Sequence, residues 1–347
     1  MKVLLTGASG FLGKEVLKRL VARPEIHSIT VVSREKTSHP DPKVRIANGD
    51  LSYAAFVDTL DDDFTDVIHL AGTCDLHKSF DERFRDNVST TANLAGRMGQ
   101  AVFHHASTFA VVDQANGRAT PEGPVEDLPP TTAAFARSKA MAEEELRRSG
   151  RPCRIFRLGA LVGNTRDGRV ERADGPYVYL KIFHRLRHLP GISLLPLLLL
   201  PAPAPGRFPL VPVDAAAAVF EKSLFLGKPG AFADEIYGVY RDDECELTGF
   251  AREIVAWFLP GVRPVFVSMA SLRAGKPGRN LLRQIPGHNL PAAGAAAEML
   301  DFTLHPRALA SRRFRHRFGD VIPRFQEWKR EFFAGFERYV NGPGFTG

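Results

Sequence analysis

Three glycines near the amino end have the spacing to hold a phosphorylated ligand. Gly7, Gly10 and Gly13 lie three residues apart, and Thr6 and Ser9 place hydroxyls beside them. In such a turn the first glycine permits a tight bend, the second lets backbone N–H groups approach a pyrophosphate, and the third lets a helix pack closely on a strand. The start of that helix offers unpaired donors and a favourable dipole. The pattern predicts a dinucleotide site.

A strand before the turn and a helix after it would position these glycines. The strand is the apolar run 3–5, and from Phe11 and Leu12 onwards apolar residues recur at helical spacing. Glycine triplets also occur in ordinary strand-to-helix turns. The place of this one, directly after the first strand, favours nucleotide binding, with Phe11 and Leu12 among the cofactor contacts.

The end of the second predicted strand, residues 28–33, bears on the choice of nucleotide. Ser33 ends that strand and Arg34 follows it, with no acidic residue at the strand end. This position meets the adenosine ribose in dinucleotide folds, where Arg accommodates a 2′-phosphate and an acidic residue binds a free 2′-hydroxyl. An ordinary surface arginine is the alternative. We expect NADP(H) in preference to NAD(H), with Ser33 and Arg34 beside the phosphate.

Strand and helix patterns alternate through the first half of the chain. The other strands are expected at 44–47, 67–70, 102–106 and 154–158, and the helices around 11–22, 79–99 and 131–148. This order predicts an α/β protein with a Rossmann-like, doubly wound parallel sheet and a smaller C-terminal region. We expect an NADP-binding core, a substrate loop or lid, a return to the core, and a C-terminal substrate-binding region with an amphipathic helix. Their ranges are 1–165, 166–208, 209–235 and 236–347.

The glycine spacing is GxxGxxG, written Thr6-Gly-Ala-Ser-Gly-Phe-Leu-Gly13, and it resembles the extended short-chain dehydrogenase/reductase (SDR) superfamily, which is epimerase/dehydratase-like. Matches at 157–163 and 209–214 extend the resemblance over about residues 1–226. A Leu/Pro-rich stretch before Val-Pro-Val-Asp214 is similar to the fatty acyl-CoA reductase or male-sterility-like branch.

The resemblance implies further cofactor residues. Gly-Asp50-Leu51 is similar to a segment that meets the adenine in that family, and Asn87 is similar to an Asn that orders the active site. The segment that passes beneath the nicotinamide side corresponds to Leu70, Ala71 and Gly72.

The resemblance also implies the catalytic residues. Phe135-Ala-Arg-Ser-Lys139 is similar to the family's Tyr-x-x-x-Lys, in which the Lys holds the nicotinamide ribose and lowers the pKa of the Tyr. That Tyr gives or takes a proton while hydride moves. Thr108 matches the residue that hydrogen-bonds the substrate carbonyl, and its neighbour Ser107 is placed among the cofactor contacts. Phe135 has no ionisable group, so the usual proton donor is absent.

Losing a general acid typically slows a reaction by about 10²–10⁴-fold. Three explanations stay open: another group supplies the proton, the reaction does not need it at that point, or the protein binds cofactor without turnover. The preferred substitute donors are Tyr177 and Tyr179. The other candidates are Asp75, His77 and His184.

These features predict an NADP(H)-dependent oxidoreductase that reduces a carbonyl or acyl-thioester of an apolar substrate. That substrate would be a small carbonyl compound, an acyl-CoA or an acyl group on a carrier. The Leu/Pro run 192–200 would either line the substrate site or pack in the core. Five arginines could meet phosphate or a carrier: Arg166, Arg169, Arg172, Arg185 and Arg187. The alternatives are a nucleotide-binding sensor or assembly protein with impaired catalysis, and a sugar-nucleotide epimerase or dehydratase.

The composition bears on the compartment, the metal content and the partners that we expect. The chain has 347 residues, a net charge of +7 and three scattered cysteines, which form no disulfide framework or metal spacing. We expect a cytoplasmic protein without metal. A basic surface suits phosphorylated ligands, and no nucleic-acid motif is present, so no nucleic-acid partner is expected. The aromatic stripe over 321–339 predicts a helix packed on the protein, with peripheral membrane contact as the alternative. The family resemblance implies a homodimer.

Overall fold

The computed structural model describes residues 1–75, 78–113, 121–125, 134–201, 207–232, 235–243, 246–267 and 311–342. A seven-stranded parallel sheet lies at the centre of the larger part, in the order β10-β6-β5-β4-β1-β2-β3. Its strands are β1 (Lys2–Thr6), β2 (Ser28–Ser33), β3 (Val44–Asn48), β4 (Asp66–His69), β5 (Val102–Thr108), β6 (Cys153–Leu158) and β10 (Ile236–Val239). The direction of strand order reverses between β1 and β4, which is where doubly wound sheets bind ligands. The predicted fold class is confirmed.

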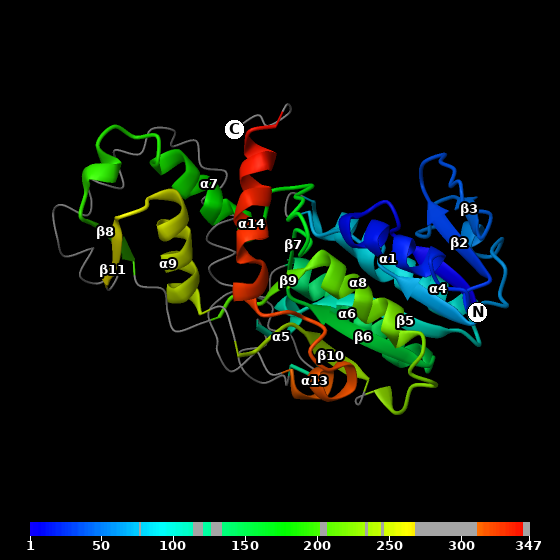
Figure 1. The fold of residues 1–347 in the computed structure, drawn as a ribbon. Coiled ribbons are helices and arrows are strands. Elements are labelled where there is room, and N and C mark those ends of the chain that lie inside the picture. The colour runs from blue at the N-terminus through cyan, green and yellow to red at the C-terminus, as the bar shows by residue number, and fades with distance from the viewer. Residues whose placement is uncertain are drawn as a thin grey trace.

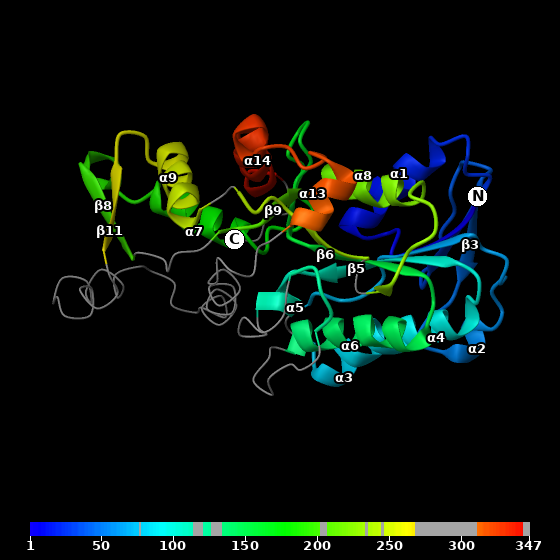
Figure 2. The same ribbon diagram turned by 90° about the horizontal axis from the view of Figure 1, so that it is seen from below.

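Helices cover both faces of this sheet (Figure 2). One face carries α1 (Phe11–Val21), α8 (Val213–Ser223) and α13 (Arg312–Phe318). The other carries α2 (Ala54–Val57), α3 (Phe80–Arg83), α4 (Thr90–Arg97) and α6 (Ala134–Ser149). The strands read as apolar runs because both of their faces are buried. The predicted helix over 79–99 is α3 and α4 joined by a π-helical turn, η1 (Phe84–Ser89). A short helix, α5 (Ala110–Asp113), follows β5.

A second lobe lies beside the sheet, with α14 on the side of the lobe that is nearer the sheet (Figure 1). It is built from α7 (Tyr177–Leu186), η2 (Ile192–Leu194), α9 (Leu247–Phe258), α14 (Phe325–Val340) and the parallel strands β8 (Leu197–Pro201) and β11 (Arg263–Val267). Another parallel pair, β7 (Ala160–Val162) and β9 (Leu210–Pro212), lies between the two parts. The apolar side of α14 is buried in the lobe, as expected for a helix packed on the protein.

The Leu/Pro run behaves as a half-buried strand. Leu198 is buried in the lobe, whereas Leu197 and Leu199 face solvent and Leu194 is 84% exposed. Figures 1 and 2 both place β8 at the outer end of the lobe, remote from the sheet. None of the described helices is long and apolar enough to cross a membrane.

Candidate functional site

The glycine turn connects β1 to α1 with very close backbone contacts. Gly7 has a φ of +72°, and a Cβ at that residue would lie 2.7 Å from the main-chain nitrogen of Ala71. A Cβ at Gly13 would lie 2.0 Å from the carbonyl oxygen of Gly7. The Gly10 N–H donates to that same carbonyl at 3.0 Å, and α1 begins without a side-chain cap. These contacts support the bend predicted at Gly7 and the close packing predicted at Gly13, and the uncapped helix start fits a bound pyrophosphate.

A buried polar chain links this turn to the next strand and helix. Thr6 Oγ1 lies 2.7 Å from His69 Nδ1 and accepts from the Ala71 N–H at 3.1 Å. His69 Nε2 lies 3.0 Å from Thr91 Oγ1, which donates to the Asn87 carbonyl at 2.7 Å. Burial lowers the pKa of His69 to about 3, so the ring is neutral. One arrangement of protons satisfies all four hydrogen bonds: Thr6 Oγ1 donates to His69 Nδ1, and the His69 Nε2–H donates to Thr91 Oγ1.

Asn87 sits in the π-helical turn η1, where the irregular backbone directs its side chain toward α6 and the end of β4. Its amide nitrogen donates to Ser138 Oγ at 2.9 Å, and its Oδ1 accepts from the Thr73 N–H at 2.8 Å. A Cβ at Gly72 would lie 2.6 Å from Asn87 Oδ1 and 3.0 Å from Lys139 Nζ. The structure therefore brings Gly72, Asn87 and Lys139 together.

Lys139 is buried, and its Nζ donates to the Ala106 carbonyl at 3.2 Å. Burial lowers the pKa of this ammonium to about 8, while the nearby charges of Cys74 and Glu143 oppose the shift. Phe135 lies one helical turn earlier on α6 and is half-buried. Its carbonyl accepts from Ser138 Oγ at 2.8 Å. The aromatic ring therefore replaces the tyrosine on a helix turn that Asn87 and Ser138 hold in place.

The two hydroxyls at the end of β5 have different surroundings. Ser107 is buried and donates to the carboxylate of Glu143, which forms a two-point ion pair with Arg157 at 2.7 and 3.1 Å. Thr108 is only half-buried, and its Oγ1 accepts from the Ala110 N–H at 3.3 Å. Ser107 is thus engaged by a buried ion pair, and Thr108 is the more available hydroxyl for a substrate oxygen.

Residues 3–182 match the NAD dependent epimerase/dehydratase family, which is slightly more than half of the chain. The protein belongs to this family. The family binds a nicotinamide cofactor. The glycine turn of this epimerase/dehydratase-family protein fits one because α1 begins there without a side-chain cap, which leaves its first N–H groups for a pyrophosphate.

Solved structures similar to the chain include two reductase domains of biosynthetic synthetases. One is a thiolation-reductase di-domain from an archaeal non-ribosomal peptide synthetase, with TM-score 0.72 and 18% identity over 98% of this chain and 75% of that one. The other is the terminal R domain of the myxalamid PKS-NRPS pathway, with TM-score 0.70 and 19% identity over 98% and 90%. At these identities the likeness shows the fold alone.

Curated relatives are also synthetases. The hybrid PKS-NRPS synthetase LUC5 from Fusarium sp is 33% identical over 162 residues, covering 41% of this chain and 4% of that protein. Fusarin C synthetase from Gibberella fujikuroi is 29% identical over 250 residues, covering 65% and 6%. The chain therefore corresponds to only a small part of these relatives. The fatty acyl-CoA reductase branch stays a prediction from the sequence.

On the adenosine side of the family core, Arg34 is exposed directly after β2. Asp50 follows β3 and accepts from the Ser52 N–H at 2.8 Å. Burial raises the pKa of Asp50, but hydrogen bonds from Ser52 and the charge of Arg34 together lower it by more. The net result is a pKa below the usual value. Leu51 is buried, and its carbonyl accepts from Asn93 Nδ2 at 2.9 Å. Arg34 and Asp50 are thus neighbours at the predicted ribose and adenine end.

The preferred substitute proton donors lie in the second lobe. Tyr177 is buried, its hydroxyl accepts from the Gly163 N–H at 2.8 Å, and its ring stacks on Phe332 at 5.1 Å. The Tyr179 hydroxyl is buried and has no hydrogen-bond partner among the described residues. Burial raises the pKa of both phenols. Each packs with the aromatic core of the lobe, and neither is recorded in contact with Lys139 or Thr108.

The other candidates have separate surroundings. The Asp75 main chain is held by Thr73 and Arg83. His184 is partly buried, and burial lowers its pKa. His77 lies outside the described residues.

The adjacent histidines of β5 have structural surroundings. His104 Nε2 lies 3.0 Å from Asp66, and its Nδ1 lies 2.7 Å from Ser223 Oγ. His105 is buried beside His69, with 5.3 Å between the ring centroids. In the part of the chain that the structure describes, no group of His, Cys, Asp and Glu could hold a metal ion.

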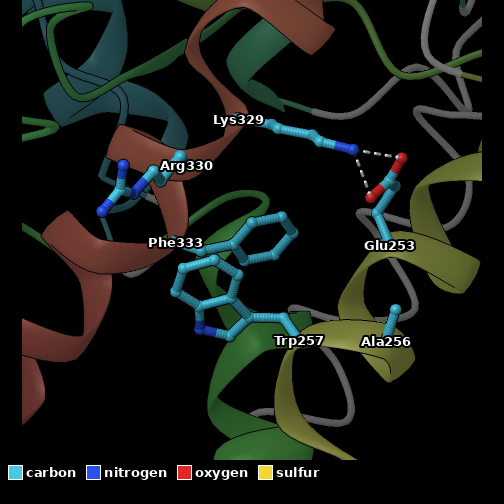
Figure 3. Close-up of a pocket in the computed structure, with 6 residues that line it drawn as sticks. All are labelled: Glu253, Ala256, Trp257, Lys329, Arg330 and Phe333. Carbon is cyan, nitrogen blue, oxygen red and sulfur yellow. Dashed lines mark hydrogen bonds and ion pairs between the residues drawn. The ribbon is translucent and has the colours of Figure 1, made fainter. Parts of the chain in front are cut away.

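A recess of about 190 Å³ lies between α9 and α14 in the second lobe (Figure 3). The Trp257 ring stacks on Phe333 at 5.1 Å, and Lys329 pairs with Glu253 at 2.9 Å at its edge. This recess is separate from the glycine turn, since it belongs to the other lobe.

Sequence reasoning missed four residues that hold the site together: His69, Thr91, Glu143 and Arg157. The signal was a polar or charged residue inside an otherwise apolar strand, as with His69 in β4 and Arg157 in β6. Such residues need buried partners, but their partners come from other elements and no local spacing identifies them.

Proposed function

We propose that the protein is an NADP(H)-dependent reductase of the extended SDR type that reduces an acyl-thioester carried by a carrier protein or coenzyme A. One observation carries the proposal. The cluster of Gly72, Asn87 and Lys139 is assembled at the carboxyl edge of an epimerase/dehydratase-family sheet. The likeness to a thiolation-reductase di-domain and to a terminal R domain of biosynthetic synthetases supports an acyl-thioester as the substrate class.

Each residue of the proposed site would have a role that follows from its position. A bound dihydronicotinamide would supply hydride. The glycine turn would hold the pyrophosphate, and Lys139 would hold the nicotinamide ribose. Thr108, half-buried at the end of β5, would donate a hydrogen bond to the thioester oxygen and favour the oxyanion that forms there. Asn87 would hold two segments of the site at a fixed separation. Its side chain contacts Thr73, next to Gly72, and Ser138, next to Lys139.

The proposed preference for NADP(H) rests on Arg34. This exposed guanidinium follows the strand that meets the ribose, and its charge acts on Asp50, but among the described residues it forms no hydrogen bond or ion pair. A 2′-phosphate would pair with it, whereas a free 2′-hydroxyl would have no carboxylate at the strand end.

Exposed arginines could receive the anionic part of the substrate. Arg172 and Arg187 are engaged with Asp174 and Glu337. Arg166, Arg169 and Arg185 are exposed, and within the described part of the chain their side chains form no hydrogen bond or ion pair. These three suit the phosphate of coenzyme A or of a phosphopantetheine arm, or acidic side chains of a carrier.

The test is NADPH oxidation with a panel of acyl-CoA and acyl-pantetheine thioesters of increasing chain length, alongside calorimetric titration with NADPH. Turnover of an apolar acyl-thioester, together with nucleotide binding, would support the proposal. Normal NADPH affinity with no thioester consumed would reject it.

A second candidate is a nucleotide-binding protein without turnover, and Phe135 is the observation that favours it. This candidate predicts NADPH binding with no oxidation on any thioester, aldehyde or ketone. Activity restored by Phe135→Tyr would favour a former enzyme.

A further inference from the structure

We propose that Phe135 makes the reduction stop at the aldehyde. On this proposal the phenylalanine determines the product: the site converts a thioester to an aldehyde but reduces aldehydes to alcohols poorly. The inference rests on the proposed thioester reductase function and adds the identity of the product.

The position of Phe135 is set by the same contacts that set Lys139. Its carbonyl accepts from Ser138 Oγ, and Ser138 Oγ accepts from Asn87. Lys139 is the next residue after Ser138, and its Nζ approaches Gly72 and Ala106. The first turn of α6 is therefore held against the end of β4, and residue 135 on that turn carries an aromatic ring without a hydroxyl.

The tyrosines of the chain are all described, and none lies on α6. Tyr53 is exposed beside α2, and Tyr237 donates to Glu235 in the sheet region. Tyr240 is buried next to β10, and Tyr339 belongs to α14. Tyr177 and Tyr179 pack in the second lobe. No phenol among them replaces the hydroxyl that is missing one turn before Lys139.

Lys139 is a poor substitute for that phenol. Its Nζ donates to the Ala106 carbonyl, and a Cβ at Gly72 would lie 3.0 Å from it. The proton of this ammonium is therefore held at the end of β5 by the Ala106 carbonyl.

Reduction of the thioester does not need the missing proton at the carbonyl oxygen. Hydride adds to the thioester carbon, and the C=O π pair moves to oxygen. The oxyanion then re-forms C=O and breaks the C–S bond, and the electron pair leaves on sulfur. A thiol has a pKa of about 8.5, so a thiolate can depart unprotonated and take its proton from water. The balance is thioester plus NADPH plus H⁺ giving aldehyde, thiol and NADP⁺.

Reduction of the aldehyde has a different requirement. Hydride addition gives an alkoxide with no group to expel, and its conjugate acid is about as weak as water, whose pKa is about 15.7. The alkoxide returns hydride unless a proton reaches it in the site. A tyrosine beside the lysine would supply that proton, but Phe135 cannot, so this step loses the roughly 10²–10⁴-fold that a general acid contributes.

The experiment compares wild type, Phe135→Tyr and Phe135→Leu on an acyl-pantetheine and on the matching aldehyde. Aldehyde, alcohol, thiol and NADPH are quantified separately. We expect wild type to form one aldehyde and one thiol per NADPH and to reduce the free aldehyde at least about 100-fold more slowly than Phe135→Tyr. Phe135→Leu, which also lacks the phenol, should match wild type on the aldehyde. Far-UV circular dichroism and NADPH affinity check that each variant is folded.

Two results would overturn the inference. One is alcohol from wild type with two NADPH oxidised per thioester. The other is a folded, NADPH-binding Phe135→Tyr with no gain on the aldehyde. If no variant consumes thioester while Phe135→Tyr alone reduces the aldehyde, the proposed thioester activity fails but the proton requirement assigned to Phe135 stands.

Discussion

The sheet part and the second lobe both have apolar cores, but they differ in the side chains that they bury beside them. In the first, buried polar groups satisfy one another along a chain from Thr6 through His69 and Thr91 to Asn87. In the second, aromatic rings pack on one another, with Phe332 in contact with Tyr177, Phe325 and Phe333. Hydrogen bonds fix direction, whereas apolar packing depends mainly on volume. The residues to which we assign the chemistry therefore lie in the part where direction is fixed.

The two parts also differ in how the chain supplies them. The site residues lie between residues 6 and 158, in consecutive strand-helix units. The lobe combines 177–201, 247–267 and 325–340, which are far apart in the sequence. We therefore expect substitutions in the lobe to change stability and substrate fit while leaving nucleotide affinity intact.

The largest effect is expected for Lys139→Met. If this ammonium holds the ribose, kcat/KM should fall by about 10²–10⁴-fold with the secondary structure unchanged. Because the pKa of Lys139 is about 8, wild-type activity should decline above pH 8 as the charge is lost. A pH profile of kcat/KM checks this, and an unchanged rate in the variant would contradict it.

The same group gives a stability prediction with a definite sign. The pKa is lower in the folded chain than the usual 10.5, so between about pH 8 and 10.5 the unfolded chain binds more protons and this group makes folding more favourable as pH rises. Denaturant titrations across that range should show a smaller rise for Lys139→Met than for wild type.

Phe332→Ala tests the independence of the lobe. Phe332 is fully buried among aromatic rings, so removing its ring should lower the free energy of unfolding by about 3–5 kcal/mol. NADPH affinity should stay within about twofold, since the polar chain of the site is untouched. Phe225→Ala, at a ring that is 43% exposed, is the control and should have a small effect. A large loss of NADPH affinity in Phe332→Ala would remove the distinction between the two parts.

Gly13→Ala tests the polar part in the same way. The new methyl would lie 2.0 Å from the Gly7 carbonyl oxygen, so α1 must shift, at a cost of about 1–3 kcal/mol in unfolding free energy. NADPH affinity should fall as the turn opens. Gly96→Ala is the matched control, because its added methyl meets nothing within 4 Å on α4. The control should be neutral or slightly stabilising.

The smallest effect is expected for Arg34→Ala. Losing one charge-assisted contact at an exposed site should weaken NADPH binding about tenfold and leave NADH binding unchanged. Arg45→Ala, at an exposed arginine on the neighbouring strand β3, is the control. Calorimetry with both nucleotides decides the outcome, and equal losses for NADPH and NADH would argue against a 2′-phosphate at Arg34.

The sequence was informative where structure follows from neighbours along the chain. Apolar runs located β2 and β5 closely, and the spacing of Gly7 and Gly13 predicted contacts that the structure contains. It was less informative for long-range pairing. Nothing local showed that β10 joins the sheet beside β6, or that Phe314 and Phe318 of α13 pack near β6. The alternation in β8, with Leu198 inward and Leu199 outward, was hidden because both residues are leucine.

The widened turn η1 has a consequence for how this site could be altered by insertion or deletion. A π-helical turn contains one residue more than a regular helix needs over the same length. Removing a single residue between Phe84 and Ser89 would let α3 and α4 fuse into one uninterrupted α-helix. The segments on either side would keep their helical phase, since the widened turn absorbs the extra residue, but the residues of the turn itself would change direction and the Asn87 amide would lose its contacts with Thr73 and Ser138. A one-codon deletion is therefore expected to preserve a well-formed helix while removing the contact that holds Ser138, the residue next to Lys139.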